Sequence, residues 1–211
     1  MTASLPNSAH ASRPWRIHQI APDFRVEDVW GISAPGKPDD FARLVQVALS
    51  ANPSRSSSSA VRALFALRWR IGELLGWDEA SEGIGSGVAT LRDRLPADLR
   101  EASRPAFEAL PFTSLYLLEN EFAAETANRT VHGVMHLGLV PDGMGGHRGQ
   151  MAVLVKPNGR LGSAYMAAIK PFRHLIVYPP LLREIEREWR GLGGEPPPVR
   201  DGVGMIGEGA A

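Results

Sequence analysis

Two histidines, His132 and His136, stand four residues apart in the apolar stretch TVHGVMHLG. In a helix this spacing puts both imidazoles on one face, one turn apart, as zinc-dependent hydrolases use it; in a strand they share a face but stand further apart. The zinc motif also has a glutamate directly after the first histidine, where this chain has Gly133. We therefore expect no metal at this pair, and consider proton transfer or core histidines with satisfied nitrogens instead.

A strand over residues 129–140 would separate polar and apolar side chains. His132 and His136 would share one face, while Met135, Leu137 and Leu139 would share the other. The histidines then face either solvent or a cavity whose polar lining orients a ligand.

Glutamates precede these histidines, in residues 113–126. If that segment is one strand, Glu121 and Glu125 share a face. A carboxylate beside an imidazole can fix its tautomer or form an acid/base pair with it, and the plain alternative is that the glutamates meet water. We take His132, His136, Glu121 and Glu125 as the candidate catalytic residues.

A second set of polar and aromatic side chains could orient a ligand. Tyrosines of this kind are more often core residues with a satisfied hydroxyl. Arg173 and its neighbour His174 can point into the mouth of a cavity or pair with carboxylates of the sheet. The candidate ligand-binding residues are Tyr116, Asn120, Tyr165, Arg173 and Tyr178.

The composition excludes several classes of protein. Lys plus Arg and Asp plus Glu both number 23, so nothing in the charge favours nucleic acid or an anionic membrane as partner. The absence of cysteine excludes disulfides, thiol catalysis and thiolate metal sites. No apolar run approaches the roughly 20 residues of a membrane span, and the first residues lack the pattern of a secretion signal. We expect a cytoplasmic protein without a cofactor and with a small hydrophobic molecule as partner; the composition does not indicate an oligomeric state.

Composition also divides the chain into three parts. Residues 1–13 are rich in Ser, Pro and Ala, and residues 191–211 are rich in Gly and Pro, so both are expected to be disordered tails. Residues 14–190 are expected to form a single domain, long enough to bury a core.

The first half of this domain predicts one strand and two helices. Residues 25–33 favour a short strand. Asp39 can cap a helix whose apolar residues recur at helical spacing up to residue 49, and a second amphipathic stripe runs over residues 59–75.

The second half predicts four strands followed by a long helix. Asn158-Gly159 is a strong hairpin signal, and the short connections imply an antiparallel meander. A terminal helix is expected over residues 171–190, with a kink or break near Tyr178 because Pro179 and Pro180 follow it; the alternative is one more strand at LIVY. The strands are expected at residues 113–126, 129–140, 149–157 and 162–171.

A strand, two helices, a run of antiparallel strands and a terminal helix make up the element order of the α+β helix-grip fold. The stretches GVATLRDRLPADLR, NRTVHGVMHLG and YMAAIKPFRHLIVYPPLLREIEREW resemble an uncharacterised bacterial family of unknown function, near the START and polyketide-cyclase-like superfamily. The resemblance implies a curved antiparallel sheet wrapped around a long kinked C-terminal helix, with a ligand cavity between them.

This resemblance also indicates a function, by analogy of fold. We expect binding of a polyketide-like or acyl molecule and its cofactor-free cyclisation, dehydration or isomerisation. One alternative is a non-catalytic carrier or sensor of a hydrophobic ligand. Another is an accessory subunit of an oxidoreductase, because relatives occur behind short-chain dehydrogenase-like domains; this chain has no strand followed by the G-x-G-x-x-G pattern of such domains.

Overall fold

The computed structural model describes most of the chain. The described residues are 3–36, 38–50, 83–85, 87–108, 110–128, 130–143, 145–159 and 178–191, together with positions 59, 62, 63, 66, 70, 162, 166, 167 and 174.

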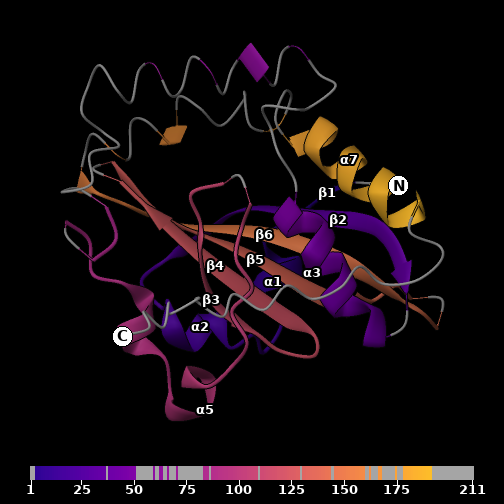
Figure 1. The fold of residues 1–211 in the computed structure, drawn as a ribbon, viewed down its shortest axis with the longest axis horizontal. Coiled ribbons are helices and arrows are strands. Elements are labelled where there is room, and N and C mark those ends of the chain that lie inside the picture. Colours follow the sequence, from indigo (N-terminus) through magenta and orange to yellow (C-terminus); the bar gives the residue numbers. More distant parts are fainter. Residues whose placement is uncertain are drawn as a thin grey trace, which may run out of the picture.

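Six antiparallel strands form one sheet, in the order β1-β2-β6-β5-β4-β3. The long strands β5 and β6 pair along their whole length and lie at the centre of the sheet, beside β2 (Figure 1). The expected α+β class and antiparallel sheet are confirmed. The strands are β1 (Ala3–Leu5), β2 (Arg25–Gly36), β3 (Thr113–Leu117), β4 (Glu121–Ala127), β5 (Val131–Pro141) and β6 (His147–Pro157).

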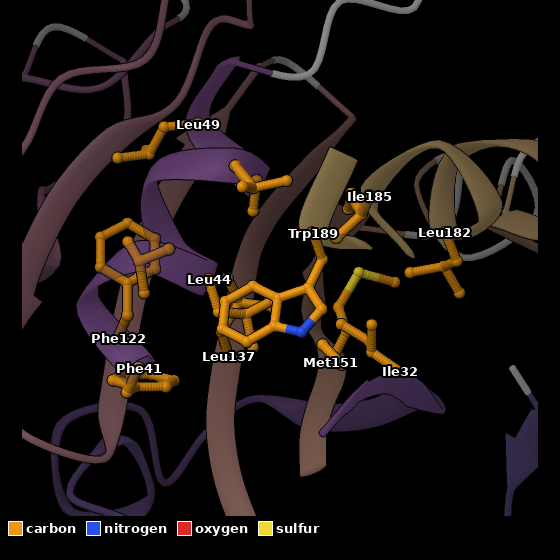
Figure 2. Packing of buried hydrophobic residues seen from close by; sticks show 14 of the residues in the cluster. Ile32, Phe41, Leu44, Leu49, Phe122, Leu137, Met151, Leu182, Ile185 and Trp189 are labelled. Atoms are coloured by element: carbon orange, nitrogen blue, oxygen red, sulfur yellow. The ribbon is translucent and has the colours of Figure 1, made fainter. Parts of the chain in front are cut away.

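Helices α3 (Phe41–Ser50) and α7 (Tyr178–Gly191) pack against each other and against one face of the sheet, here called the α7 face. A single 3-10 turn, η1 (Pro38–Asp40), precedes α3. Figure 2 shows Trp189 of α7 among apolar side chains from α3 and from the sheet. The sheet residues on this face include Trp30, Ile32, Phe122, Leu137 and Met151.

The opposite face of the sheet, here called the N-terminal face, is covered by short helical segments. These are α1 (Ser8–Ala11), α2 (Ile17–Ile20), η4 (Leu91–Arg94) and α5 (Ala97–Arg100). Ile17, Leu91 and Leu99 from these segments pack in a second apolar cluster. The sheet residues in that cluster include Val29, Ala123, Val134, Ala152 and Leu154.

The beginning of the chain differs from the expected tail. Residues 3–5 pair with β2, and α1 packs beside the same strand. His10 is fully buried, and Asn7 donates a hydrogen bond to the Val26 carbonyl at 2.7 Å. The prediction failed here because the segment is too short and polar to show a periodic pattern, while its contacts are with residues far along the chain.

The strand expected over residues 113–126 is two strands, β3 and β4, joined by a tight turn. Leu118 N donates to the Glu121 carbonyl at 2.8 Å, and Glu119 and Asn120 are exposed. Asparagine is a favoured turn residue, but apolar neighbours on both sides hid this turn in the sequence. The correction matters because folding the segment back brings Tyr116 next to Glu121.

The region after β6 also differs from the expectation of a hairpin. Gly159 has a positive φ of 70°, as the Asn-Gly turn signal predicts, but the described residues that follow, Gly162, Met166 and Ala167, are helical instead of extended. The segment SAYMAAIK is rich in good helix formers, which favours this outcome. The remainder of residues 160–177, apart from His174, lies outside the described residues.

The two other expected helices are described in part. Ser59, Arg62, Ala63, Ala66 and Arg70 are helical, within the helix predicted over residues 59–75. The described part of the terminal helix is α7 (Tyr178–Gly191), which includes both prolines. The kinked helix expected over residues 171–190 stays a prediction for its first part.

No helix in the described part of the chain is long and apolar enough to cross a membrane.

Candidate functional site

The register of β4 and β5 puts each candidate glutamate diagonally across from one candidate histidine. Ala123 pairs with His136, which brings the Nε2 atom of that histidine to 3.1 Å from Glu121 Oε1. The same diagonal relation brings His132 Nε2 to 2.8 Å from Glu125 Oε2, where it donates a hydrogen bond. The structure therefore brings the four candidate catalytic residues together as two separate pairs.

All four side chains are buried on the N-terminal face, beneath the short helices. None of these side chains is more than 5% exposed. The glutamates therefore do not meet water, which was the plain alternative for them. The histidines do not share a layer with α7, because β5 turns Met135, Leu137 and Leu139 towards that helix instead.

Glu121 is held by hydrogen bonds from two parts of the chain. The hydroxyl of Tyr116 donates to Oε1 at 2.6 Å. The backbone N–H groups of Arg16 and Ile17, at the start of α2, donate to Oε2 at 2.9 Å and to Oε1 at 3.0 Å. Burial would raise the pKa of Glu121, but the contacts with His136, the Tyr116 hydroxyl and the Arg16 N–H outweigh it and lower the pKa to about 2. Glu121 is therefore ionised at neutral pH.

Tyr116, one of the candidate ligand-binding residues, belongs to this cluster. It is fully buried, and burial together with the adjacent Glu121 carboxylate raises the pKa of its hydroxyl. The hydroxyl therefore keeps its proton and acts as a donor.

A chain of three histidines leads from the surface to Glu121. His10 Nε2 lies 3.1 Å from His136 Nδ1, and the rings of His10 and His18 make an edge contact with centroids 4.9 Å apart. His18 is half-buried, whereas the other two are fully buried. Burial, followed by repulsion from His136 and His18, lowers the pKa of His10 to about 3. Burial likewise lowers the pKa of His136.

These shifts make the inner two histidines neutral at neutral pH. In the tautomers that fit both distances, His136 carries its proton on Nε2, facing Glu121, and His10 donates from its Nε2 to His136 Nδ1. Nε2 of His136 approaches the carboxylate without hydrogen-bond geometry, and Nδ1 of His10 has no partner among the described residues. The cluster therefore contains two buried ring nitrogens, His136 Nε2 and His10 Nδ1, without a hydrogen bond among the described residues.

The Trp15 ring covers this cluster and contacts the rings of His10 and His136. Its ring centroid is 5.1 Å from that of His136. A Cβ atom added at Gly138, next to His136 on the same face, would lie only 2.6 Å from the Trp15 ring. The absence of a side chain at position 138 therefore lets the indole lie close against the strand.

Glu125 has a similar arrangement with a different part of the chain. Besides His132, it accepts hydrogen bonds from the hydroxyl of Thr90 and, at 3.0 Å, from Leu91 N at the start of η4. Burial would raise the pKa of Glu125, but the hydrogen bonds from His132, Thr90 and Leu91 outweigh it and lower the pKa. Phe24 covers the edge of the His132 ring, with centroids 4.9 Å apart.

The two glutamates therefore share a structural task. Glu121 accepts from two backbone N–H groups at the start of α2 and Glu125 from one at the start of η4, so each holds a covering segment against the sheet. Each also orients an imidazole, which is the arrangement that proton transfer requires. Among the described residues, no group of three or more His, Asp or Glu side chains is placed to hold a metal ion.

The other ligand-binding candidates are not part of this cluster. Asn120 is exposed in the turn between β3 and β4, where its carbonyl accepts a hydrogen bond from Leu139 N at 2.9 Å. Tyr165 and Arg173 lie outside the described residues. Tyr178 lies on the α7 face, so the sheet separates it from Glu121 and His136.

Tyr178 contacts a third carboxylate and histidine, on the α7 face. The Asp28 carboxylate accepts a hydrogen bond from the Tyr178 hydroxyl at 3.0 Å and lies 2.5 Å from His174 Nε2. Asp28 is 1% exposed. Trp30 lies against both aromatic partners, with ring centroids 5.7 Å from His174 and 5.6 Å from Tyr178.

Sequence reasoning missed Asp28 and His10 as parts of polar clusters. The signal for Asp28 is its alternation with Trp30 and Ile32, which puts a carboxylate on a strand face that is otherwise apolar. His174 was expected either at a cavity mouth or paired with a carboxylate of the sheet, and it has the second kind of partner. No comparable local signal marks His10.

Comparison with curated proteins and with solved structures gives no match. A family model described as "Protein of unknown function (DUF2867)" matches residues 20–180, which include both histidine–glutamate pairs and the Asp28 cluster. That match covers most of the chain, and the protein therefore belongs to the DUF2867 family.

Proposed function

We propose that this protein binds a small hydrophobic molecule of polyketide-like or acyl type and transforms it by cofactor-free acid/base chemistry, such as cyclisation, dehydration or isomerisation. The observation that supports the proposal is that three of the six histidines each contact a buried carboxylate: His132 with Glu125, His136 with Glu121 and His174 with Asp28. Burial of a carboxylate is costly unless it is paired, so three such pairs need a reason.

The Glu121 pair has the protonation states that general-base chemistry uses. His136 is neutral and would receive a proton at Nδ1 through His10, which donates to that atom from Nε2, while the ionised Glu121 carboxylate would stabilise the imidazolium that forms. His10 contacts the ring of the half-buried His18, so these two histidines lie between His136 and the surface. Tyr116 keeps its proton and would hold the carboxylate in place.

A non-catalytic carrier or sensor is the second candidate function, because a specific observation favours it. Both glutamates accept most of their hydrogen bonds from backbone N–H groups of the covering segments and from the hydroxyls of Thr90 and Tyr116. On that view the pairs anchor the fold, and the chemistry of the bound molecule is unchanged. Both candidate functions require the predicted cavity between the sheet and α7. The described side chains of that layer form an apolar cluster (Figure 2), so the cavity stays a prediction.

Two measurements on the full chain test the proposal. Native mass spectrometry of the purified protein detects a co-purified small molecule. The probe 5-nitrobenzisoxazole, an apolar compound opened by removal of one C–H proton, reports a general base in an apolar site. A bound molecule together with probe turnover faster than that of free imidazole supports the enzyme.

Variants separate the two candidates. His132→Gln, His136→Gln and His174→Gln each remove the imidazole of one histidine–carboxylate pair, and if the protein is an enzyme at least one of them should lower probe turnover and keep the bound molecule. His147→Gln serves as the matched control because His147 lies outside every cluster described above. A bound molecule without turnover supports the carrier. A wild-type protein with neither property contradicts the proposal.

A further inference from the structure

We infer that Asp28, His174 and Tyr178 form the place where the substrate meets the reacting base, with His174 as the catalytic residue. The inference rests on the proposed function and deepens it, because it assigns the proton-transfer step to the α7 face and leaves the two glutamate pairs as anchors of the N-terminal face.

The first argument is the orientation of the three side chains. Both oxygens of the Asp28 carboxylate have a partner: Oδ1 lies 2.5 Å from His174 Nε2 and Oδ2 accepts from the Tyr178 hydroxyl. A carboxylate can only accept, so His174 carries its proton on Nε2 and has its lone pair on Nδ1. This is the tautomer of a general base whose partner stabilises the imidazolium once a proton has been taken up.

The second argument is access. The side chain of His174 is 29% exposed, while those of His132 and His136 are 5% and 0% exposed. A reacting base must come within hydrogen-bond reach of the proton that it removes. Of the three histidine–carboxylate pairs, the one on the α7 face combines a buried carboxylate with an imidazole that a molecule from solution can touch.

The third argument concerns the kind of substrate. Trp30 is 7% exposed and lies against both His174 and Tyr178, so the base has an aromatic wall beside it. A flat apolar molecule with a carbonyl oxygen and an acidic C–H next to it fits this combination, since its ring can lie against the aromatic side chains while its C–H faces the base.

The step is a proton transfer and needs no other reactant. His174 Nδ1 takes the proton from the carbon next to the carbonyl group, and the C–H electron pair moves into an enolate whose negative charge rests on the carbonyl oxygen. The imidazolium then returns the proton to a different carbon, which gives an isomer. Alternatively, the enolate carbon attacks a second carbonyl of the same molecule, which closes a ring, and the imidazolium gives its proton to the alkoxide formed from that carbonyl. Asp28 accepts from His174 Nε2 throughout, and the Tyr178 hydroxyl holds it in place.

The competing interpretation is that the cluster only joins the end of the chain to β2. Glu186 of α7 already does this, because its carboxylate accepts a hydrogen bond from Ser33 N at 2.8 Å. A purely structural Asp28 cluster would change stability when mutated and would leave the reactivity of the protein towards a base-sensitive probe unchanged. The experiment therefore measures both.

The test uses 5-nitrobenzisoxazole and the full chain. A base removes the proton from the ring carbon, the C–H electrons form the nitrile, and the N–O bond breaks with its electrons going to the oxygen. The product is a coloured cyanonitrophenolate, so the reaction is followed by absorbance. We expect His174→Gln to lower the rate at least about tenfold, in line with the contribution of a positioned general base. His147→Gln should keep the wild-type rate, and circular dichroism and the melting temperature show whether each variant is folded.

Two further measurements do not depend on a folded variant. Long-range proton–nitrogen NMR of the wild-type protein should show His174 protonated on Nε2. Diethyl pyrocarbonate modifies accessible imidazoles, and peptide mass spectrometry should show that loss of turnover follows modification of His174 and not of His147. Protection of turnover by the bound probe would support the same site.

The outcomes separate the inference from the proposed function. If His174→Gln keeps the wild-type rate while His136→Gln loses it, the inference is wrong and the proposed function stands with its base on the N-terminal face. If the wild-type protein reacts no faster than free imidazole, the inference is overturned. In that case a small molecule retained in native mass spectrometry still supports the carrier, and its absence overturns the proposed function as well.

Discussion

His10 Nε2 lies 3.1 Å from His136 Nδ1, so an imidazole from α1 meets one from the middle of β5 in the buried layer beneath Trp15. Burial lowers the pKa of both, and His18, Glu121 and Trp15 are the other groups packed around them. Two neutral imidazoles in contact tolerate burial well. Two imidazolium ions in contact would repel each other, which makes this layer sensitive to acid.

The first prediction concerns stability and pH. The pKa of His10 falls from an ordinary value of 6.5 to about 3 in the folded protein, so between these values the unfolded chain binds the proton and the folded one does not. The free energy of unfolding should therefore be highest above pH 6.5 and should fall by about 1.4 kcal/mol per pH unit from this group as the pH drops towards 3. Urea unfolding at pH 7, 6 and 5 measures the slope.

His10→Gln is the matched variant, because its amide cannot be protonated in this range. Its stability should depend less steeply on pH, by about one proton, in the same series of urea titrations. An identical slope in the variant and the wild-type protein would contradict the assignment of a neutral buried His10.

The second prediction concerns the charge of Glu121. Glu121→Gln leaves one amide oxygen where two carboxylate oxygens accept hydrogen bonds from Tyr116, Arg16 and Ile17. The free energy of unfolding should fall by about 2 to 3 kcal/mol, the usual cost of losing hydrogen bonds to a buried charged group. Glu119→Gln, in the exposed turn two residues earlier, should change it by less than about 0.5 kcal/mol. Equal effects of the two substitutions would show that Glu121 does not hold α2 in place.

The third prediction concerns the contact between Gly138 and Trp15. In Gly138→Ala the new methyl group would lie 2.6 Å from the ring, so the indole must move. We expect a loss of about 1 to 3 kcal/mol and a change in tryptophan fluorescence that reports exposure of Trp15.

Gly133→Ala is the control on the same strand. Its Cβ would meet Thr126 Cγ2 at 3.8 Å, an ordinary contact, so stability and fluorescence should stay close to the wild-type values. The Gly138→Ala effect on fluorescence should disappear in a background that carries Trp15→Phe; its persistence there would mean that another tryptophan reports the change.

The fourth prediction concerns the first thirteen residues. Their removal takes away β1 and the imidazole of His10, and it uncovers His136 and Gln150, whose side chain donates to the Ala9 carbonyl at 3.4 Å. The shortened chain should melt at a lower temperature and exchange the backbone amides of β2 and β5 faster. Unchanged melting and exchange would mean that these residues are a dispensable tail, as their composition alone predicts.

Local patterns in the sequence determined the elements that repeat a clear period. The apolar spacing of residues 41–49 predicted α3, and runs of alternating or β-branched residues predicted β2, β5 and β6 with small errors at their ends. These patterns succeed because one buried face imposes its period on the residues that form it. The short N-terminal elements and the turn at Glu119 and Asn120 have too few consecutive residues with one buried face to show a periodic apolar pattern.

The sequence also predicted which residue types form the candidate site, but it did not predict how they are arranged. The residue types in the sequence predicted that histidines and glutamates near residues 121–136 could form acid/base pairs, whereas the register of β4 and β5 decided which glutamate faces which histidine. Tertiary structure alone brought His10 to His136, across 126 residues, and His174 to Asp28, across 146. It also put the two kinds of cluster on opposite faces of one sheet, because neighbouring residues of a strand point to opposite sides and only the packed layers decide what covers each side.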